Sequence, residues 1–355
     1  MGSQFGALAL LFAFLNSVSS DPLVPEHVLD NFKLNRGVKE HYPLSLRSIQ
    51  GLSIALDHGP SVTLDHLIPI SIFSESANCY NNHQQVECPA STVFRKVDQY
   101  GRKVLVTENS SGDIETIVVR GGNKPAQTLQ AVDPGVFTQI PEEALDEAYD
   151  SMFHIRHEEL SKRDMRHLRT RLPQDYEQSS PQHRSLAGCS EYRVIELAIA
   201  AESSFCASVG LANVNSTINR IVADVALEYE MSGLCFTVEV THLETQCDPD
   251  TDEYKEGVAI NLSGCGNYGL LDKFEEFWNA NRASVHRDVA QLLSGTGLEC
   301  DSDGCVIGCA YVGTSCVNPS YSYGVNWVTY TTDTVRQKHL VAHEIGHVLG
   351  KRYKW

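Results

Sequence analysis

Short apolar runs rich in Val, Ile, Leu and Thr mark the chain from residue 21 to about residue 145. Such runs cover residues 61–64, 103–107 and 115–119. Turn residues rich in Gly, Pro and Asp separate them. Short runs of these residues, bounded by turn residues, are typical of strands. The pattern therefore predicts a β-rich N-terminal region.

The pattern changes at Cys189, where longer apolar runs alternate with segments of helical period. The apolar residues of 213–231 recur every three or four positions, which predicts an amphipathic helix. Residues 270–282 form a second predicted helix, with Phe274, Phe277 and Trp278 toward the core. The fold class expected here is mixed α/β, with a final helix that begins near Thr332 and Asp333. The predicted strands cover residues 192–201, 234–241, 289–293, 306–312 and 325–330.

Length and charge limit the classes of function. The 355 residues are enough for about two domains, and 42% hydrophobic residues are enough for a core. A net charge of −17 argues against a main role in binding nucleic acid or an anionic membrane.

Residues 1–20 are typical of a secretory signal peptide. An apolar run, Ala7–Leu15, precedes small residues suited to cleavage after Ser20. The run is too short for a membrane anchor, and no other segment is predicted to span a bilayer. We therefore expect a secreted protein. Three glycosylation sequons agree with this expectation, at Asn109, Asn215 and Asn261.

The eleven cysteines also fit an extracellular protein. Cys79 and Cys88 lie early, and the other nine fall in the second half of the chain. This crowding predicts disulfides, with one thiol left over because the number is odd.

A polar and basic stretch from about residue 146 to 188 separates the two regions. Two overlapping Arg-x-x-Arg sequences end at Arg166 and Arg169. The stretch is either a plain solvated linker or a linker that a furin-like convertase cuts, and the two interpretations are compatible.

Further on, Asp248–Glu253 begins like a calcium loop but has Glu253 where the turn needs glycine. We interpret it as a surface turn.

The strongest chemical signal is His-Glu-Ile-Gly-His at residues 343–347. On a helix, His343 and His347 lie on one face, one turn apart, where both imidazoles can bind one Zn²⁺. Glu344 can then act as general base toward a zinc-bound water. The apolar residues around the motif favour a buried helix over a solvated one that carries two histidines by chance.

Gly350 extends the motif toward the longer pattern H-E-x-x-H-x-x-G-x-x-H. The third histidine of that pattern would fall at residue 353, which is Tyr353 here, and the sequence ends at Trp355. We expect a metal site with two of its three protein ligands. The pattern indicates that a C-terminal part of the domain is missing.

With this helix placed last in an α/β region, residues 190–355 resemble the reprolysin branch of the metzincins, which includes ADAM, ADAM-TS and snake-venom metalloproteases. Three further segments carry the resemblance: Arg193–Leu197, the Asp-x-Ala-Gln-Leu run 288–292, and the Gly-x-Ala run toward Cys316. The resemblance implies a metzincin catalytic domain without its lower subdomain. It also implies that residues 21–169 form a propeptide with its linker.

The resemblance further implies site residues and cofactors. Zinc would be bound by His343 and His347, and Glu344 would be catalytic. Glu196 and Asp288 match a structural Ca²⁺ site of parts of the family, although a strand-edge carboxylate and a turn cap are the plainer interpretation. A propeptide thiol, Cys79 or Cys88, would cap the zinc unless the two form a disulfide.

The function expected from these features is that of a secreted, zymogen-type zinc endopeptidase. It would hydrolyse peptide bonds in extracellular proteins after processing by a furin-like convertase. The alternative is a truncated, non-catalytic secreted protein that binds a protease or a substrate. Zinc stoichiometry and peptide hydrolysis distinguish the two.

Overall fold

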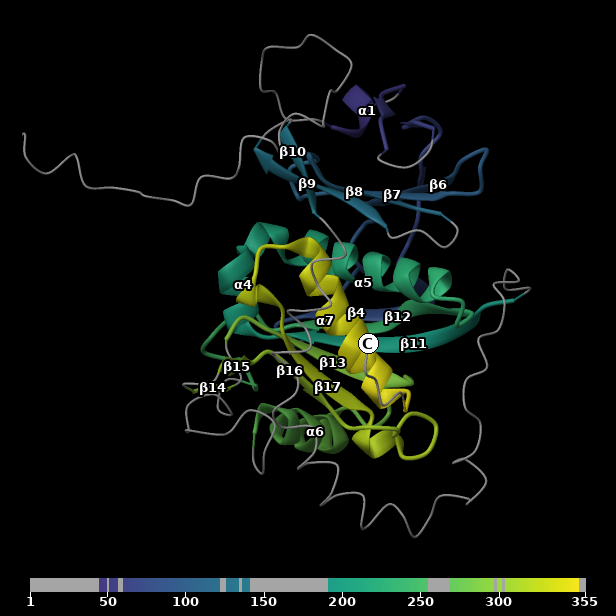
Figure 1. Ribbon diagram of the computed structural model, residues 1–355. Coiled ribbons are helices and arrows are strands. Elements are labelled where there is room, and N and C mark those ends of the chain that lie inside the picture. The colour runs from purple at the N-terminus through teal and green to yellow at the C-terminus, as the bar shows by residue number, and fades with distance from the viewer. Residues whose placement is uncertain are drawn as a thin grey trace, which may run out of the picture.

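The computed structural model describes residues 45–49, 51–56, 60–121, 126–133, 136–140, 191–254, 269–296, 299–301 and 304–350. Within these ranges, Figure 1 shows alternating layers: an N-terminal sheet, helices, a central sheet, and a helix on the far face. The predicted mixed α/β architecture with a β-rich N-terminal region is confirmed.

The N-terminal sheet has six strands in the order β10-β9-β8-β7-β6-β3, and every neighbouring pair is antiparallel. Its buried side chains, such as Val104, Val106 and Ile117, form a core of their own with Ile49 and Leu64. The elements of this region are α1 (Leu46–Ile49), β1 (Ser53–Ile54), β2 (Val62–Thr63), β3 (Ile68–Pro69), β6 (Val93–Val97), β7 (Lys103–Glu108), β8 (Ile114–Arg120), β9 (Gln127–Asp133) and β10 (Val136–Ile140).

The central sheet has seven strands in the order β16-β17-β13-β11-β12-β4-β5. Strands β11, β12, β13 and β17 are parallel, and most of their residues are buried because the sheet is covered on both faces. Their bounds are β11 (Arg193–Ala201), β12 (Phe236–Thr245), β13 (Val289–Ser294), β16 (Gly308–Ala310) and β17 (Tyr323–Trp327).

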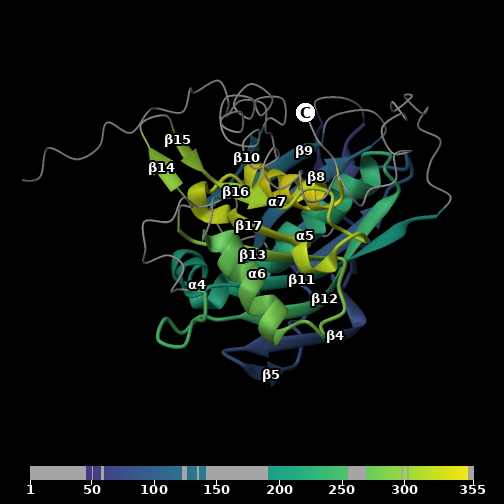
Figure 2. The same ribbon diagram turned by 90° about the horizontal axis from the view of Figure 1, so that it is seen from below.

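Two strands of the central sheet come from the N-terminal region. Strand β4 (Phe73–Asn81) pairs in parallel with β12, and β5 (Gln84–Val86) folds back against β4. Figure 2 shows both at the edge of the sheet. The sequence pattern predicts strands but not their partners, so this crossing between the two regions was not foreseen.

Helices cover both faces of the central sheet. On the side of the N-terminal sheet lie α4 (Ser203–Val209), α5 (Val214–Met231) and α7 (Thr334–Val348), and α6 (Leu270–Asn281) covers the opposite face (Figure 1). The buried Phe274 and Trp278 confirm the predicted inner face of α6. Short 3₁₀ turns occupy Leu211–Asn213, Pro319–Tyr321 and Val328–Tyr330.

Two predicted strands differ from the structure. The segment 306–312 is divided, because β15 (Gly304–Val306) pairs with β14 (Glu299–Asp301) whereas β16 pairs with β17. The segment 325–330 ends as a strand at Trp327, where the chain enters a 3₁₀ turn. In both cases the pairing partner, rather than the local sequence, sets the boundary.

Ion pairs join the N-terminal sheet to the helix layer. Glu230 of α5 pairs with Arg95 at 2.7 Å and with Lys103 at 2.5 Å. Glu228 pairs with Arg120 and, at 3.3 Å, with Lys338 of α7. These carboxylates are only 10% and 13% exposed, so the pairs are shielded from solvent and fix how the sheet lies on α5.

Candidate metal and catalytic site

The candidate site lies on α7, whose sequence determines both its start and its burial. The Asp333 carboxylate caps the helix by accepting hydrogen bonds from the backbone N–H groups of Val335 and Arg336. Leu340, Val341, Ile345 and Val348 then recur at helical spacing and are at most 1% exposed. This inward face holds the motif in a buried helix, as the sequence predicts.

The two motif histidines meet on one face of α7. His343 and His347 are 7% and 6% exposed, and their Nε2 atoms lie 2.8 Å apart. Two nitrogens bound to one tetrahedral zinc at about 2.0–2.1 Å lie roughly 3.3 Å apart, so a small opening of the pair makes room for the ion. The donor set fits zinc, because both imidazoles converge on a single point.

Glu344 lies between the two histidines in the sequence and is fully buried, at 0% exposure. Neither of its carboxylate oxygens has a hydrogen-bond partner among the described residues. Burial raises the pKa of Glu344 well above its usual value. A carboxylate with a raised pKa and no partner is suited to accept and return a proton.

The edge strand β16 packs directly on this carboxylate. A Cβ added to Gly308 would lie 2.5 Å from Glu344 Oε1 and 2.7 Å from Leu340 Cδ1. Glycine is therefore the residue that lets the strand approach the motif so closely. The sequence predicts this strand but not its contact with Glu344; Gly308 is the signal that could have revealed it.

Both ends of the motif are anchored to neighbouring elements. The Tyr229 hydroxyl of α5 donates a 2.6 Å hydrogen bond to the backbone carbonyl of Ala342. At the C-terminal end, the backbone N–H of Gly313 donates to the His347 carbonyl at 2.9 Å. Gly350 has φ 91°, so the helix ends in the left-handed conformation that favours glycine. Tyr353, at the position of the expected third ligand, lies outside the described residues.

The two calcium candidates are brought together. Asp288 Oδ2 accepts a hydrogen bond from the backbone N–H of Glu196 at 3.0 Å, and Glu196 Oε2 lies 2.8 Å from His286 Nδ1. Asp288, the residue before β13, is thus linked to β11 by a hydrogen bond, and the Glu196 carboxylate contacts the imidazole of His286. The calcium assignment stays a prediction.

The zinc-capping thiol expected as one alternative needs correction. Cys79 and Cys88 form a disulfide with an S–S distance of 2.03 Å, so neither sulfur is a free thiolate. The bond closes the β4–β5 hairpin, where both cysteines lie close together. A second disulfide joins Cys206 and Cys247, and Cys316 is free and exposed.

Other predicted residues are placed in part. Asn215 is exposed on α5, whereas the Asn109 side chain is half-buried and accepts backbone hydrogen bonds from Ser111 and Asp113. The signal peptide, Arg166, Arg169 and Asn261 lie outside the described residues. In the part of the chain that the structure describes, none of the helices has the length and apolar character needed to cross a bilayer.

Comparisons with known proteins agree with the geometry of α7. Residues 191–352 match the family model Reprolysin_5, described as metallo-peptidase family M12. This part of the chain thus matches a metallopeptidase domain of family M12, as its resemblance to the reprolysins predicts, and peptidases of this family typically use zinc.

Other comparisons add little. No curated protein gives a significant match. A chain in a solved structure described as "Structure of a chaperone-substrate complex" is 13% identical, with a TM-score of 0.33 over 45% of this chain and 24% of that one. The present chain thus spans about a quarter of that chain, and a likeness this weak supports no argument.

Proposed function

We propose that the chain is a secreted, zymogen-type zinc endopeptidase that hydrolyses peptide bonds in extracellular proteins. The observation that carries the proposal is the geometry of α7: two imidazole Nε2 atoms converge beside a buried carboxyl group that has no hydrogen-bond partner within the described part of the chain. The match to family M12 supports the same chemistry.

In this proposal each residue has one role. His343 and His347 hold the zinc ion, which when bound supplies a Lewis acid for the scissile carbonyl and acidifies water. Glu344 takes the proton from the attacking water and passes it to the leaving amine. The low polarity around Glu344 strengthens this role, because its raised pKa brings it nearer the working pH.

Substrate binding is assigned to strand β16. It is the terminal strand of the central sheet and lies against Glu344. An extended peptide that added to this edge would bring its backbone alongside the motif. The substrates are then extracellular proteins or peptides in extended conformation.

The N-terminal region has the role of a propeptide in this proposal. It covers the helix layer that carries the motif, and its ion pairs with Glu228 and Glu230 fix it there. A furin-like convertase would cut after Arg166 or Arg169. The disulfides of the structure are consistent with secretion.

The test measures zinc content and hydrolysis of fluorogenic peptides by the purified chain, before and after convertase treatment. Glu344→Gln keeps the shape of the side chain but removes the general base, so we expect a fall in kcat of about 10²–10⁴-fold with zinc content unchanged. A folded wild-type chain that binds no zinc at α7 and cuts no peptide would refute the proposal in favour of a non-catalytic binding protein.

A further inference from the structure

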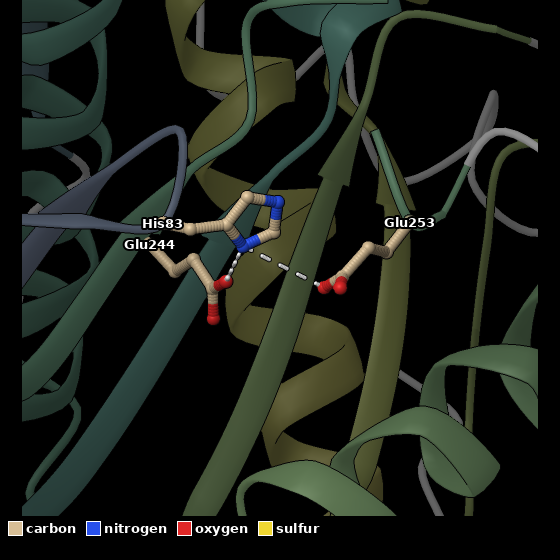
Figure 3. A group of neighbouring side chains, drawn as sticks. All are labelled: His83, Glu244 and Glu253. Carbon is tan, nitrogen blue, oxygen red and sulfur yellow. Dashed lines mark ion pairs between the residues drawn. The ribbon is translucent and has the colours of Figure 1, made fainter. Parts of the chain in front are cut away.

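A second group of potential metal ligands lies at the far edge of the central sheet, where the N-terminal region joins it. Figure 3 shows His83 in the turn between β4 and β5, Glu244 near the end of β12, and Glu253 in the loop that follows. His83 Nδ1 lies 3.9 Å from Glu244 Oε1 and 3.8 Å from Glu253 Oε2. The three ligand atoms all lie within 4.8 Å of one another.

The backbone holds His83 in this position. Asn82 and His83 have φ values of 44° and 64°, as the two central residues of a tight hairpin turn require. Asn82 Oδ1 accepts hydrogen bonds from the backbone N–H groups of Cys247 and Asp248, at 2.9 and 3.2 Å. The turn is thus fixed to the loop that carries Glu253.

The hydrogen bonding of His83 directs Nδ1 toward the two carboxylates. Its Nε2 lies 3.3 Å from the backbone carbonyl oxygen of Thr251, which can only accept a hydrogen bond. Nε2 therefore carries the hydrogen, and in the neutral ring Nδ1 has only a lone pair. Nδ1 faces the two carboxylates, so a metal ion bound between the three groups would be held by one ring nitrogen and two carboxylate oxygens, whereas a proton on Nδ1 would give two ion pairs instead.

The two carboxylates are already arranged for a positive charge. Burial alone would raise the pKa of Glu244, but contacts with His242 and Arg282 lower it to about 2, so the group is ionised at neutral pH. The Gln246 side-chain amide donates to Glu244 Oε1 at 2.9 Å and to Glu253 Oε2 at 3.2 Å. This single amide holds both carboxylates against the same point.

We propose that His83, Glu244 and Glu253 bind a divalent transition-metal ion, with zinc as the reference ion, between the N-terminal hairpin and the M12 domain. One imidazole and two carboxylates form a three-ligand set that suits zinc, whereas Ca²⁺ and Mg²⁺ prefer oxygen alone. A ligating histidine commonly donates its other N–H to a backbone carbonyl, as His83 does to Thr251.

This site is independent of the peptidase activity, since none of its ligands lies on α7. Arg282 also binds Glu244, through hydrogen bonds of 2.7 and 2.9 Å, and its positive charge weakens the attraction for a metal ion. We therefore expect micromolar rather than nanomolar affinity. A bound ion would link the turn of the β4–β5 hairpin to β12 and to the loop that follows β12. Its removal should therefore loosen the contact between this turn and that loop.

The experiment uses the full chain with His343→Ala and His347→Ala, which remove both proposed zinc ligands of α7. After dialysis against a chelator, calorimetric titration with ZnCl₂ should show one zinc per chain. Adding His83→Asn should weaken this binding at least tenfold. The matched control is His66→Asn, since His66 is also exposed and also has a positive φ, of 50°; it should leave the affinity unchanged.

A folded double variant that takes up no zinc overturns the proposal, and His83 is then a protonated ion-pair partner of the two glutamates. Equal zinc affinity in the His83→Asn and His66→Asn chains overturns it as well. If the α7 double variant does not fold, the same pair is compared in the wild-type background. There His83→Asn, but not His66→Asn, should lower the zinc content by one ion per chain; no difference refutes the site.

Discussion

Glu344 and Glu244 are both fully buried, at 0% exposure, yet their surroundings are opposite. Glu344 lies in the middle of α7 without a hydrogen-bond partner among the described residues, and burial raises its pKa well above the usual value. Glu244 lies near the end of β12 among Arg282, Gln246 and His242, and its pKa is lowered to about 2 in spite of burial.

The comparison separates two uses of a buried carboxyl group. Glu244 is ionised and satisfied, so it contributes to holding the fold together. Glu344 has no compensating partner in the part of the chain that the structure describes, so its burial destabilises the metal-free fold, and the proposed function uses this unpartnered carboxyl group for proton transfer. Substitutions of Glu244 and Glu344 test the contrast through opposite changes in stability, and Gly308→Ala tests the contact that confines Glu344.

The largest effect is expected for Glu244→Gln. The variant leaves the Arg282 charge without its anionic partner, so the free energy of unfolding at pH 7 should fall by about 3 kcal/mol. Because the pKa of Glu244 lies below its ordinary value of 4.5, its stabilisation is present above about pH 4.5 and lost as the pH falls toward 2. Urea unfolding in metal-free buffer between pH 3 and pH 7 measures this loss.

The matched control for this variant is Glu253→Gln. The Glu253 side chain is 38% exposed, so its substitution should change the metal-free stability by less than about 0.5 kcal/mol. Equal losses from both substitutions would show that burial of Glu244 is not what makes it stabilising.

The second effect concerns the contact that confines Glu344. Gly308→Ala places a Cβ 2.5 Å from Glu344 Oε1 and 2.7 Å from Leu340 Cδ1, so these buried side chains, or β16 and α7 themselves, must shift. Overpacking of this kind should cost about 1–3 kcal/mol and lower the thermal midpoint. An unchanged midpoint, measured by calorimetry, would mean that β16 moves freely from the helix and does not confine the carboxyl group.

The smallest effect has the opposite sign. In metal-free protein at pH 7, Glu344→Gln should raise the free energy of unfolding by about 1–2 kcal/mol, because a neutral amide replaces a buried acid that lacks partners. The folded-state pKa is raised, so wild-type stability falls as the pH rises above about 4.5. The gain should therefore vanish near pH 4. A destabilised variant at pH 7 would show that Glu344 has compensating partners in solution.

The sequence by itself determined the site on α7. Five consecutive residues, 343–347, place two imidazoles and a carboxyl group on a helix by local geometry alone, and the apolar residues between them indicate its burial. The same local logic predicted α5, α6 and the parallel strands, because hydrophobic period depends only on neighbours in the chain.

Only the tertiary structure decided which segments meet. The period of β4 shows a strand but not that it leaves its own region to pair with β12, since strand pairing depends on contacts between distant residues. That pairing brings His83 to Glu244 and Glu253, which lie 161 or more positions away in the sequence. Glu253, which the sequence places in a surface turn, thereby becomes part of a cluster of potential metal ligands. The spacing of residues on a helix depends only on neighbours in the chain. A cluster built from the β4–β5 turn, β12 and the loop after β12 exists only once the whole sheet has formed.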